Sequence, residues 1–174
     1  MKRILFVIVS MILAYQMKSQ CFEIQSILVD ACAGSQEGQN EMVTFQVGSS
    51  PLSTANLSVN WPNNSWLGLT KNAGTAADIA TVNATILGCG FLKEPTAGVL
   101  PANSKVLLIT STAWTPLAQS FVNLTDTLYV IFQTAGNTAG HFANYQAGGG
   151  LRTLTMSFSS PPSCNDAVTY DRAL

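Results

Sequence analysis

The stretch Leu57-Ser58-Val59-Asn60-Trp61 alternates apolar and polar residues with a period of two. Successive side chains of a β-strand point to opposite faces of a sheet, so this alternation predicts a strand with one buried face. The same alternation recurs twice, at Val43, Phe45 and Val47 and at Leu154, Met156 and Phe158. Residues 22–30, 106–110 and 128–132 are more continuously apolar, which suits central strands covered on both faces.

One segment has helical periodicity instead. The sequence Thr-Ala-Ala-Asp at residues 75–78 resembles a capping box at the start of a helix. Ile79, Val82 and Ile86 follow at helical spacing, and Gly88 supplies a stop. Six or more short strands with one short helix predict an all-β fold, an immunoglobulin-like β-sandwich in which two sheets pack face to face. A closed barrel is the alternative arrangement.

The N-terminal segment has the features of a secretory signal peptide. Lys2 and Arg3 precede an apolar run at residues 4–14, and a polar stretch follows. The run is too short for a permanent membrane-spanning helix, which needs about 20 residues. We therefore expect residues 1–19 to be removed and residues 20–174 to form one domain, secreted or displayed at the cell surface, with no membrane insertion after cleavage. A lipid anchor on Cys21 is the competing interpretation.

The charge composition limits the classes of partner. Charged residues make up 10% of the chain and the net charge is −1, whereas an average soluble domain has about 25% charged residues. After the predicted leader the basic residues are few and scattered: Lys71, Lys93, Lys105, Arg152 and Arg172. Phosphate binding needs clustered Lys and Arg side chains, so we expect no nucleic-acid partner.

All four cysteines lie after the predicted leader, at Cys21, Cys32, Cys89 and Cys164. An even number of cysteines in an exported chain predicts disulfides, and we expect two. The spacings contain no Cys-x-x-Cys pair and the chain has one histidine, so a zinc site would be short of ligands. Four cysteines allow three pairings, among which the sequence does not choose.

Three carboxylates flank the loop at residues 31–40. Adjacent antiparallel strands could bring Asp30 and Glu41 together, with Glu37 nearby. Calcium prefers carboxylate and carbonyl oxygens, so this loop is the best place in the sequence for a calcium ion. The alternative is that the three are solvated loop carboxylates. No other cofactor is expected.

Aromatic side chains outside the clean strand patterns are candidates for stacking on sugar rings: Trp66, Trp114 and Tyr145. The alternative is that they cap the core. Trp61 alternates with Leu57 and Val59 and is therefore expected in the core. Any Ser-His-Asp or Cys-His arrangement would have to use His141, the only histidine, and no Gly-x-Ser-x-Gly motif occurs. We expect a structural histidine and no enzymatic activity.

The order of these motifs resembles the lamin tail domain, an immunoglobulin-like module. The resemblance rests on the strand at residues 22–30, on Glu41-Met42-Val43-Thr44-Phe45, on residues 57–61 and on residues 99–108. Residues 21–32, 59–66 and 138–145 are similar to the opening domain of gliding-motility-associated bacterial surface proteins. The resemblance implies a non-catalytic interaction or structural module of an adhesin-type surface protein, whose partner is a surface protein or a glycan. The alternative is a carbohydrate- or calcium-dependent binding domain.

Overall fold

A computed structural model describes residues 20–29, 37–134, 136, 139–143, 149–159 and 163–172, with Glu37 described by its backbone alone. The strands in chain order are β1 (Phe22–Leu28), β2 (Met42–Val47), β3 (Leu52–Ser53), β4 (Leu57–Asn60), β5 (Leu69–Thr70), β6 (Phe91–Lys93), β7 (Val99–Leu100), β8 (Lys105–Ile109), β9 (Thr127–Gln133), β10 (Leu151–Phe158) and β11 (Cys164–Asp171). The helical elements are the 3-10 turns η1 (Glu37–Asn40) and η2 (Thr54–Asn56) and the α-helix α2 (Ala73–Asn83). The prediction of a mostly β chain with one short α-helix is confirmed for the described residues.

The strands form two main sheets. The larger sheet has the order β1-β2-β8-β9-β5, with β6 also paired to β9. Its β1–β2 and β2–β8 pairs are antiparallel, whereas β8 and β6 both run parallel to β9. The smaller sheet has the order β11-β10-β4 and is antiparallel throughout. A separate two-stranded pair joins β3 to β7.

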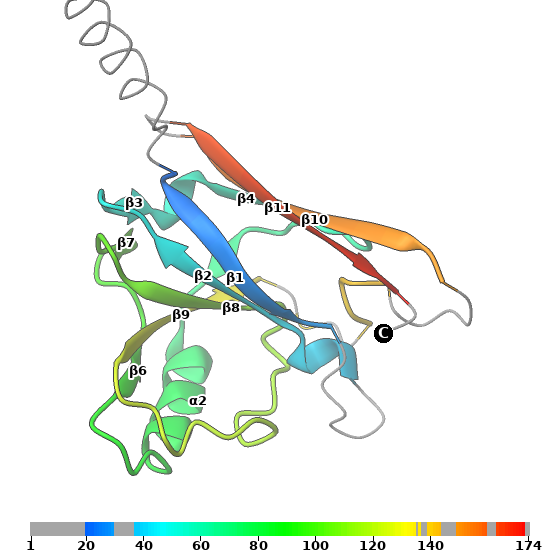
Figure 1. The fold of residues 1–174 in the computed structure, drawn as a ribbon. Helices are drawn as coiled ribbons and strands as arrows, with labels where there is room; N and C mark the ends of the chain where they lie inside the picture. Colours follow the sequence, from blue (N-terminus) through cyan, green and yellow to red (C-terminus); the bar gives the residue numbers. More distant parts are fainter. Residues whose placement is uncertain are drawn as a thin grey trace, which may run out of the picture.

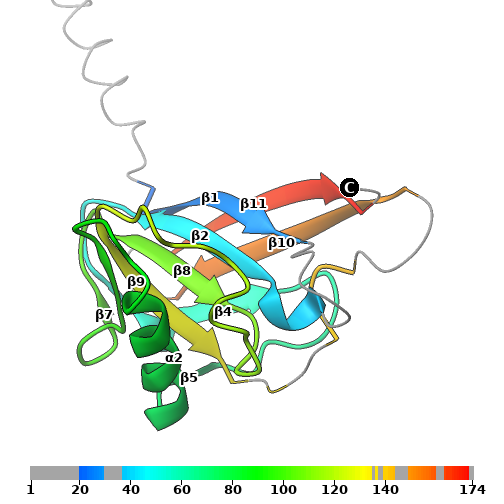
Figure 2. The ribbon, with the colours of Figure 1, turned by 90° about the horizontal axis from the view of Figure 1, so that it is seen from below.

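The larger sheet is covered on both faces. The smaller sheet lies over one face and α2 lies against the other (Figures 1 and 2). Between the sheets, the Phe22 and Phe158 rings meet edge to face with centroids 5.1 Å apart. On the opposite face, Ile79 and Val82 of α2 pack against side chains of β8 and β9. This double covering explains the continuous apolar runs of β8 and β9.

Helix α2 begins earlier than predicted. Asn72 is the N-cap, and its Oδ1 atom accepts the N–H groups of Gly74 and Thr75 at 2.8 and 3.1 Å. Thr75 completes the capping box from inside the helix, because its Oγ1 atom accepts the N–H of Asn72 at 3.0 Å. The expectation of Thr75 as the first capping residue is therefore wrong by one turn. Asn72 takes the role because its backbone is extended there.

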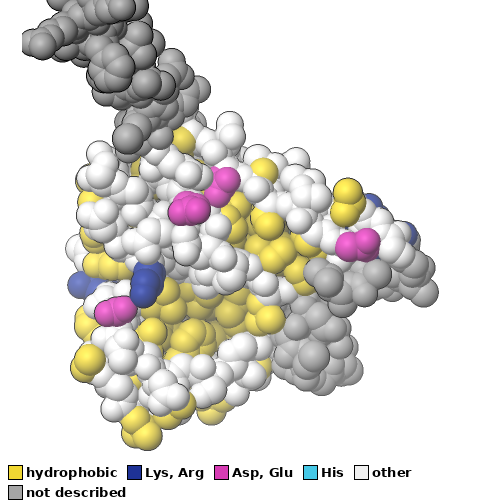
Figure 3. Space-filling model, in the orientation of Figure 1, with side chains coloured by type: hydrophobic (Ala, Val, Ile, Leu, Met, Phe, Trp, Pro, Cys, Tyr) yellow, Lys and Arg dark blue, Asp and Glu magenta, His cyan; other side chains and the backbone are white. Residues whose placement is uncertain are grey.

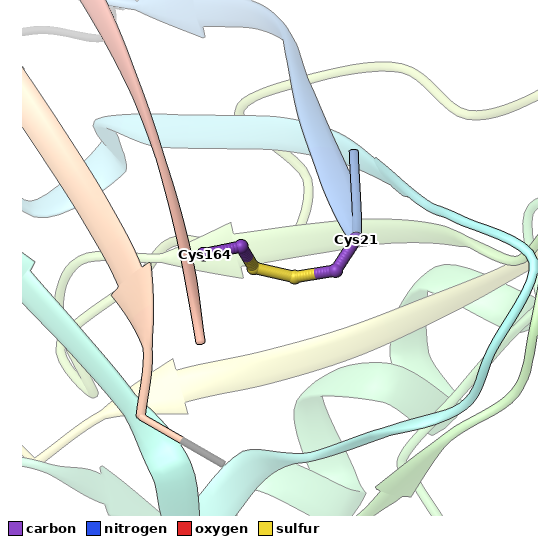
Figure 4. Close-up of a disulfide and its surroundings, with 2 residues drawn as sticks. All are labelled: Cys21 and Cys164. Atoms are coloured by element: carbon purple, nitrogen blue, oxygen red, sulfur yellow. A yellow bond between two sulfur atoms is a disulfide. The ribbon is translucent and has the colours of Figure 1, made fainter. Parts of the chain in front are cut away.

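A disulfide joins the two sheets at one corner (Figure 4). It links Cys21, directly before β1, to Cys164, the first residue of β11, with the Cα atoms 6.2 Å apart. A hydrogen bond from the Ile24 N–H to Asp166 Oδ2, at 2.7 Å, connects the same two strands.

The expectation that all four cysteines pair needs correction. Cys89 is a free, exposed thiol in the connection between α2 and β6, and its Sγ atom donates to the Thr125 carbonyl at 3.2 Å. The flanking glycines, Gly88 and Gly90, lie against the backbone of residues 123–126, which holds this loop in place. Cys32 lies outside the described residues.

Candidate functional site

A cluster of buried polar side chains lies where the two sheets are connected. We call it the polar cluster, and its members are Trp61 after β4, Glu41 before β2, Thr110 after β8, Gln133 at the end of β9 and His141 in the β9–β10 connection. Glu41 is 1% exposed, and Gln133 and His141 are 0% exposed. Buried polar groups are costly without partners, so their hydrogen bonds define what the cluster does.

The side-chain carboxyl group of Glu41 holds the β9–β10 connection. Its Oε2 atom accepts the backbone N–H of His141, and Oε1 accepts that of Phe142 at 3.5 Å. The backbone carbonyl of Glu41 also accepts the N–H and the hydroxyl of Thr110, at 3.2 and 3.1 Å. Burial raises the pKa of Glu41 to about 8, outweighing the two backbone hydrogen bonds, which lower it.

A chain of hydrogen bonds fixes the protonation of His141. The Trp61 indole N–H donates to Gln133 Oε1 at 2.6 Å. The Gln133 amide nitrogen must therefore face the Thr110 carbonyl at 3.2 Å and His141 Nε2 at 2.7 Å. An indole nitrogen only donates and an amide nitrogen only donates, so His141 Nε2 is an acceptor and the ring proton lies on Nδ1. Burial lowers the pKa of His141 to about 4, which agrees with a neutral ring.

The polar cluster is enclosed by aromatic side chains. The Trp61 ring lies 5.1 Å from the His141 ring and 5.6 Å from the Phe142 ring, measured between centroids. The Tyr170 hydroxyl of β11 donates to the Phe142 carbonyl. His141 Nδ1 lies 4.0 Å from Glu41 Oε2 and has no hydrogen-bond partner among the described residues. The arrangement ties the β9–β10 connection to both sheets.

The structure corrects the calcium expectation at Glu41. Both carboxylate oxygens of Glu41 accept backbone N–H groups, and the side chain is buried, so it is not available as a calcium ligand. Asp30 lies outside the described residues, and the side chain of Glu37 is not described. Across the described ranges, no group of three His, Cys, Asp or Glu side chains could hold a metal ion.

The aromatic candidates for sugar stacking are in different environments. Trp114 is 4% exposed and packs on Phe132 of β9, with ring centroids 5.9 Å apart. Its indole is part of the core beside α2, so its assignment to a sugar site was wrong. Trp66 is partly buried against the core between the sheets, and Tyr145 lies outside the described residues. Trp61 is 5% exposed, which confirms its predicted core position.

A pocket of about 240 Å³ lies at the edge of the larger sheet that ends in β5. Leu69 of β5 and Val130 and Ile131 of β9 line it, together with two charged residues, Lys71 and Glu94. Lys71 Nζ lies 3.4 Å from Glu94 Oε2 and donates to the Pro95 carbonyl at 3.3 Å. Sequence reasoning missed this pocket because its charged residues adjoin strands of only two and three residues, which carry no periodic signal.

Charges are sparse on the face seen in Figure 3. A few Lys, Arg, Asp and Glu side chains, some of them side by side, are surrounded by hydrophobic side chains and by white surface, which is other side chains and backbone. One of the surface ion pairs joins Lys105 to Asp126 at 3.1 Å, with both side chains well exposed. Among the described elements, no helix has the length and apolar character needed to cross a membrane.

Comparisons with known proteins give no assignment: no family, no curated protein and no solved structure matches the chain.

Proposed function

We propose that this chain is a non-catalytic structural or interaction module of an exported, adhesin-type cell-surface protein. The observation that carries the proposal is that His141, the only histidine, is hydrogen-bonded to Glu41 inside the protein. Both are buried, and both bond to groups of the protein itself. A general acid or base must reach the proton it transfers on a substrate, and enclosed groups with internal partners are suited to fastening a loop instead.

The disulfide supports the exported location in this proposal. Structural disulfides persist in oxidising compartments and are rare in the cytosol. The Cys21–Cys164 bridge follows directly after the predicted leader, residues 1–19. We also propose the finer fold assignment, a lamin-tail-like, immunoglobulin-like sandwich of the kind found in gliding-motility-associated surface proteins. Two facing sheets support it, whereas the parallel β8–β9 pair departs from the antiparallel sheets of that fold.

The test is the location of the full chain in producing cells. Intact cells are treated with a non-penetrating protease, and the cell envelope, medium and cytosol are probed for the chain. The proposal predicts that the chain is in the envelope or medium and is protease-accessible. A chain that stays protected in the cytosol with residues 1–19 attached would contradict it.

A second candidate function, sugar binding, is favoured by the Lys71–Glu94 pocket. Its volume suits one pyranose ring, and the partly exposed Leu69 in its lining offers an aliphatic contact for the C–H face of that ring. Lys71 and Glu94 offer a donor and an acceptor 3.4 Å apart, which neighbouring hydroxyls of a sugar could engage. A glycan array tests this with Lys71→Met and, as a matched control, Lys105→Met in the exposed Lys105–Asp126 pair. Binding lost only in Lys71→Met supports the site, whereas binding unaffected by both excludes it.

A further inference from the structure

We propose that Gln20, which becomes the first residue when residues 1–19 are removed, cyclises to pyroglutamate and closes the N-terminus beside the Cys21–Cys164 disulfide. The inference rests on the proposed function, because only a chain that is exported and cleaved there exposes the α-amine of Gln20. It adds a covalent modification at a named residue, which export alone does not imply.

The chemistry is an acyl transfer within one residue. The α-amine nitrogen of Gln20 attacks the side-chain amide carbon Cδ, and a bond forms between these two atoms. The bond from Cδ to the side-chain nitrogen breaks, and that nitrogen takes a proton from the attacking amine and leaves as ammonia. No oxidant, reductant or other reactant is consumed. The pKa of an α-amine is about 7.7–8.0, so part of it is neutral and nucleophilic near neutral pH.

The side chain of Gln20 is available for this ring. Gln20 is exposed, and no hydrogen bond joins its side chain to another described residue. The ring that closes has five members, the N, Cα, Cβ, Cγ and Cδ atoms of the same residue. Because the amine and the amide belong to one residue, the step is intramolecular and is favoured over a reaction between separate groups.

The chain that follows is held in place and does not have to move. The Gly48 N–H donates to the Cys21 carbonyl at 2.8 Å. A Cβ atom added at Gly48 would clash with the Gln20 carbonyl oxygen, so the two backbones are in close contact. Cys21 is 5% exposed and is bridged to Cys164. The carbonyl group of Gln20 lies outside the new ring, so the anchored backbone accommodates the modification without rearrangement.

The ring changes the properties of the mature N-terminus. Lactam formation removes the positive charge of the terminus, as other N-terminal blocking groups do. Aminopeptidases act on a free α-amine, so they cannot remove a pyroglutamate. The exposed end is one residue before the buried Cys21, and the ring therefore protects the segment that carries the disulfide.

The test is mass spectrometry of the mature protein recovered from the cell envelope or medium. Amines are dimethylated on the intact protein first, because a dimethylated amine cannot form the lactam during later handling. We expect an N-terminal peptide that begins at residue 20, has lost one ammonia relative to glutamine and carries no label on its first residue. Gln20→Asn is the matched control, since its shorter side chain would need a smaller, strained ring. Its first residue should be labelled.

Two results would overturn the modification. One is a peptide that begins at Gln20 with a labelled α-amine, which would leave export supported. The other is a mature chain that begins at a different residue after the leader has been removed. A chain that retains residues 1–19 in the cytosol would instead contradict the proposed function as well, so failure of the ring and failure of export are distinguishable.

Discussion

Glu41 and His141 lie 100 residues apart in the sequence, yet the Oε2 atom of Glu41 accepts the backbone N–H of His141 inside the protein. Glu41 enters the larger sheet at β2, and His141 lies in the connection that leaves this sheet at β9 and enters the smaller one at β10. The bond therefore fastens the crossover between the two sheets. Both residues are buried, so solvent cannot replace this hydrogen bond.

Replacing Glu41 should destabilise the fold. In Glu41→Ala, the N–H groups of His141 and Phe142 lose their acceptor in a buried site. A buried donor left unpaired costs roughly 1–3 kcal/mol, so we expect a loss of about 3 kcal/mol in the free energy of unfolding, measured with urea. The control is Glu23→Ala, an exposed position on β1, which should change it by less than about 0.5 kcal/mol. Equal effects of the two substitutions would refute the role of Glu41.

The polar cluster should also give a characteristic dependence of stability on pH. The pKa of Glu41 is raised from 4.5 to about 8, so the folded state binds the extra proton and stability is lost as pH rises through 8. The pKa of His141 is lowered from 6.5 to about 4, so stability is lost as pH falls from 6.5 towards 4. Between pH 4.5 and 6.5 the two slopes oppose each other and nearly cancel.

We therefore expect the thermal midpoint to be nearly constant from pH 4.5 to 6.5 and to fall from pH 6.5 to 8. Glu41→Gln removes the titrating carboxyl and should flatten the decline on the alkaline side. Thermal unfolding followed by circular dichroism across this range measures both proteins. A midpoint that rises between pH 6.5 and 8, or a decline of equal slope in Glu41→Gln, would disagree with the raised pKa of Glu41.

The tautomer of His141 depends on Trp61. The indole N–H fixes the orientation of the Gln133 amide, which in turn keeps a donor facing His141 Nε2. Trp61→Phe removes the N–H, so the Gln133 amide can turn, and its oxygen can then accept a hydrogen bond from a protonated Nε2 of His141. We expect the pKa of His141 to move upward from about 4 in this variant.

Nitrogen chemical shifts measure this directly, because the chain has one histidine and its ring signals need no assignment among several. The unmodified protein should show a neutral ring protonated on Nδ1 at pH 7. Trp66→Phe is the matched control, since Trp66 is partly buried but is not in the polar cluster. A ring protonated on Nε2 in the unmodified protein would show that the chain of hydrogen bonds is wrongly assigned.

The disulfide should make a large contribution to stability. Closing a loop of more than 100 residues removes denatured-state entropy worth about 5 kcal/mol in the chain-entropy model. Cys164→Ser opens the 143-residue separation between Cys21 and Cys164. We expect its free energy of unfolding to fall by about 3–5 kcal/mol relative to Cys89→Ser, which leaves the bridge intact. Urea titration of both variants under non-reducing conditions checks this, and equal midpoints would argue against it.

The sequence predicted buried positions correctly where a single strand alternates apolar and polar residues. Leu57, Val59 and Trp61 alternate cleanly, and all three are in the core between the sheets as predicted. Strand β11 escaped prediction because Asp166 interrupts its apolar positions. Asp166 is tolerated there since its carboxylate accepts the Ile24 N–H of β1, a contact between strands 142 residues apart that no local pattern reveals.

The candidate sites were harder to predict because they depend on contacts distant in sequence. Glu41 was expected at a calcium site from its closeness to Asp30 and Glu37. The groups that occupy its oxygens come from the connection after β9, which the sequence places far away. Trp114 lies outside any strand pattern, yet it is buried because α2 and the loop after β8 form a second core. Local periodicity predicts which face is buried, and not which loop returns to cover it.

Peptide mapping by mass spectrometry, without reduction, of the protein recovered from outside the cytosol tests the central claim most directly. The account predicts an N-terminal peptide that begins at Gln20 and is linked through Cys21 to the peptide containing Cys164. Cleavage at this position and the bridge together would support export of a covalently closed surface module. A chain that retains residues 1–19 with Cys21 and Cys164 as free thiols would contradict the account.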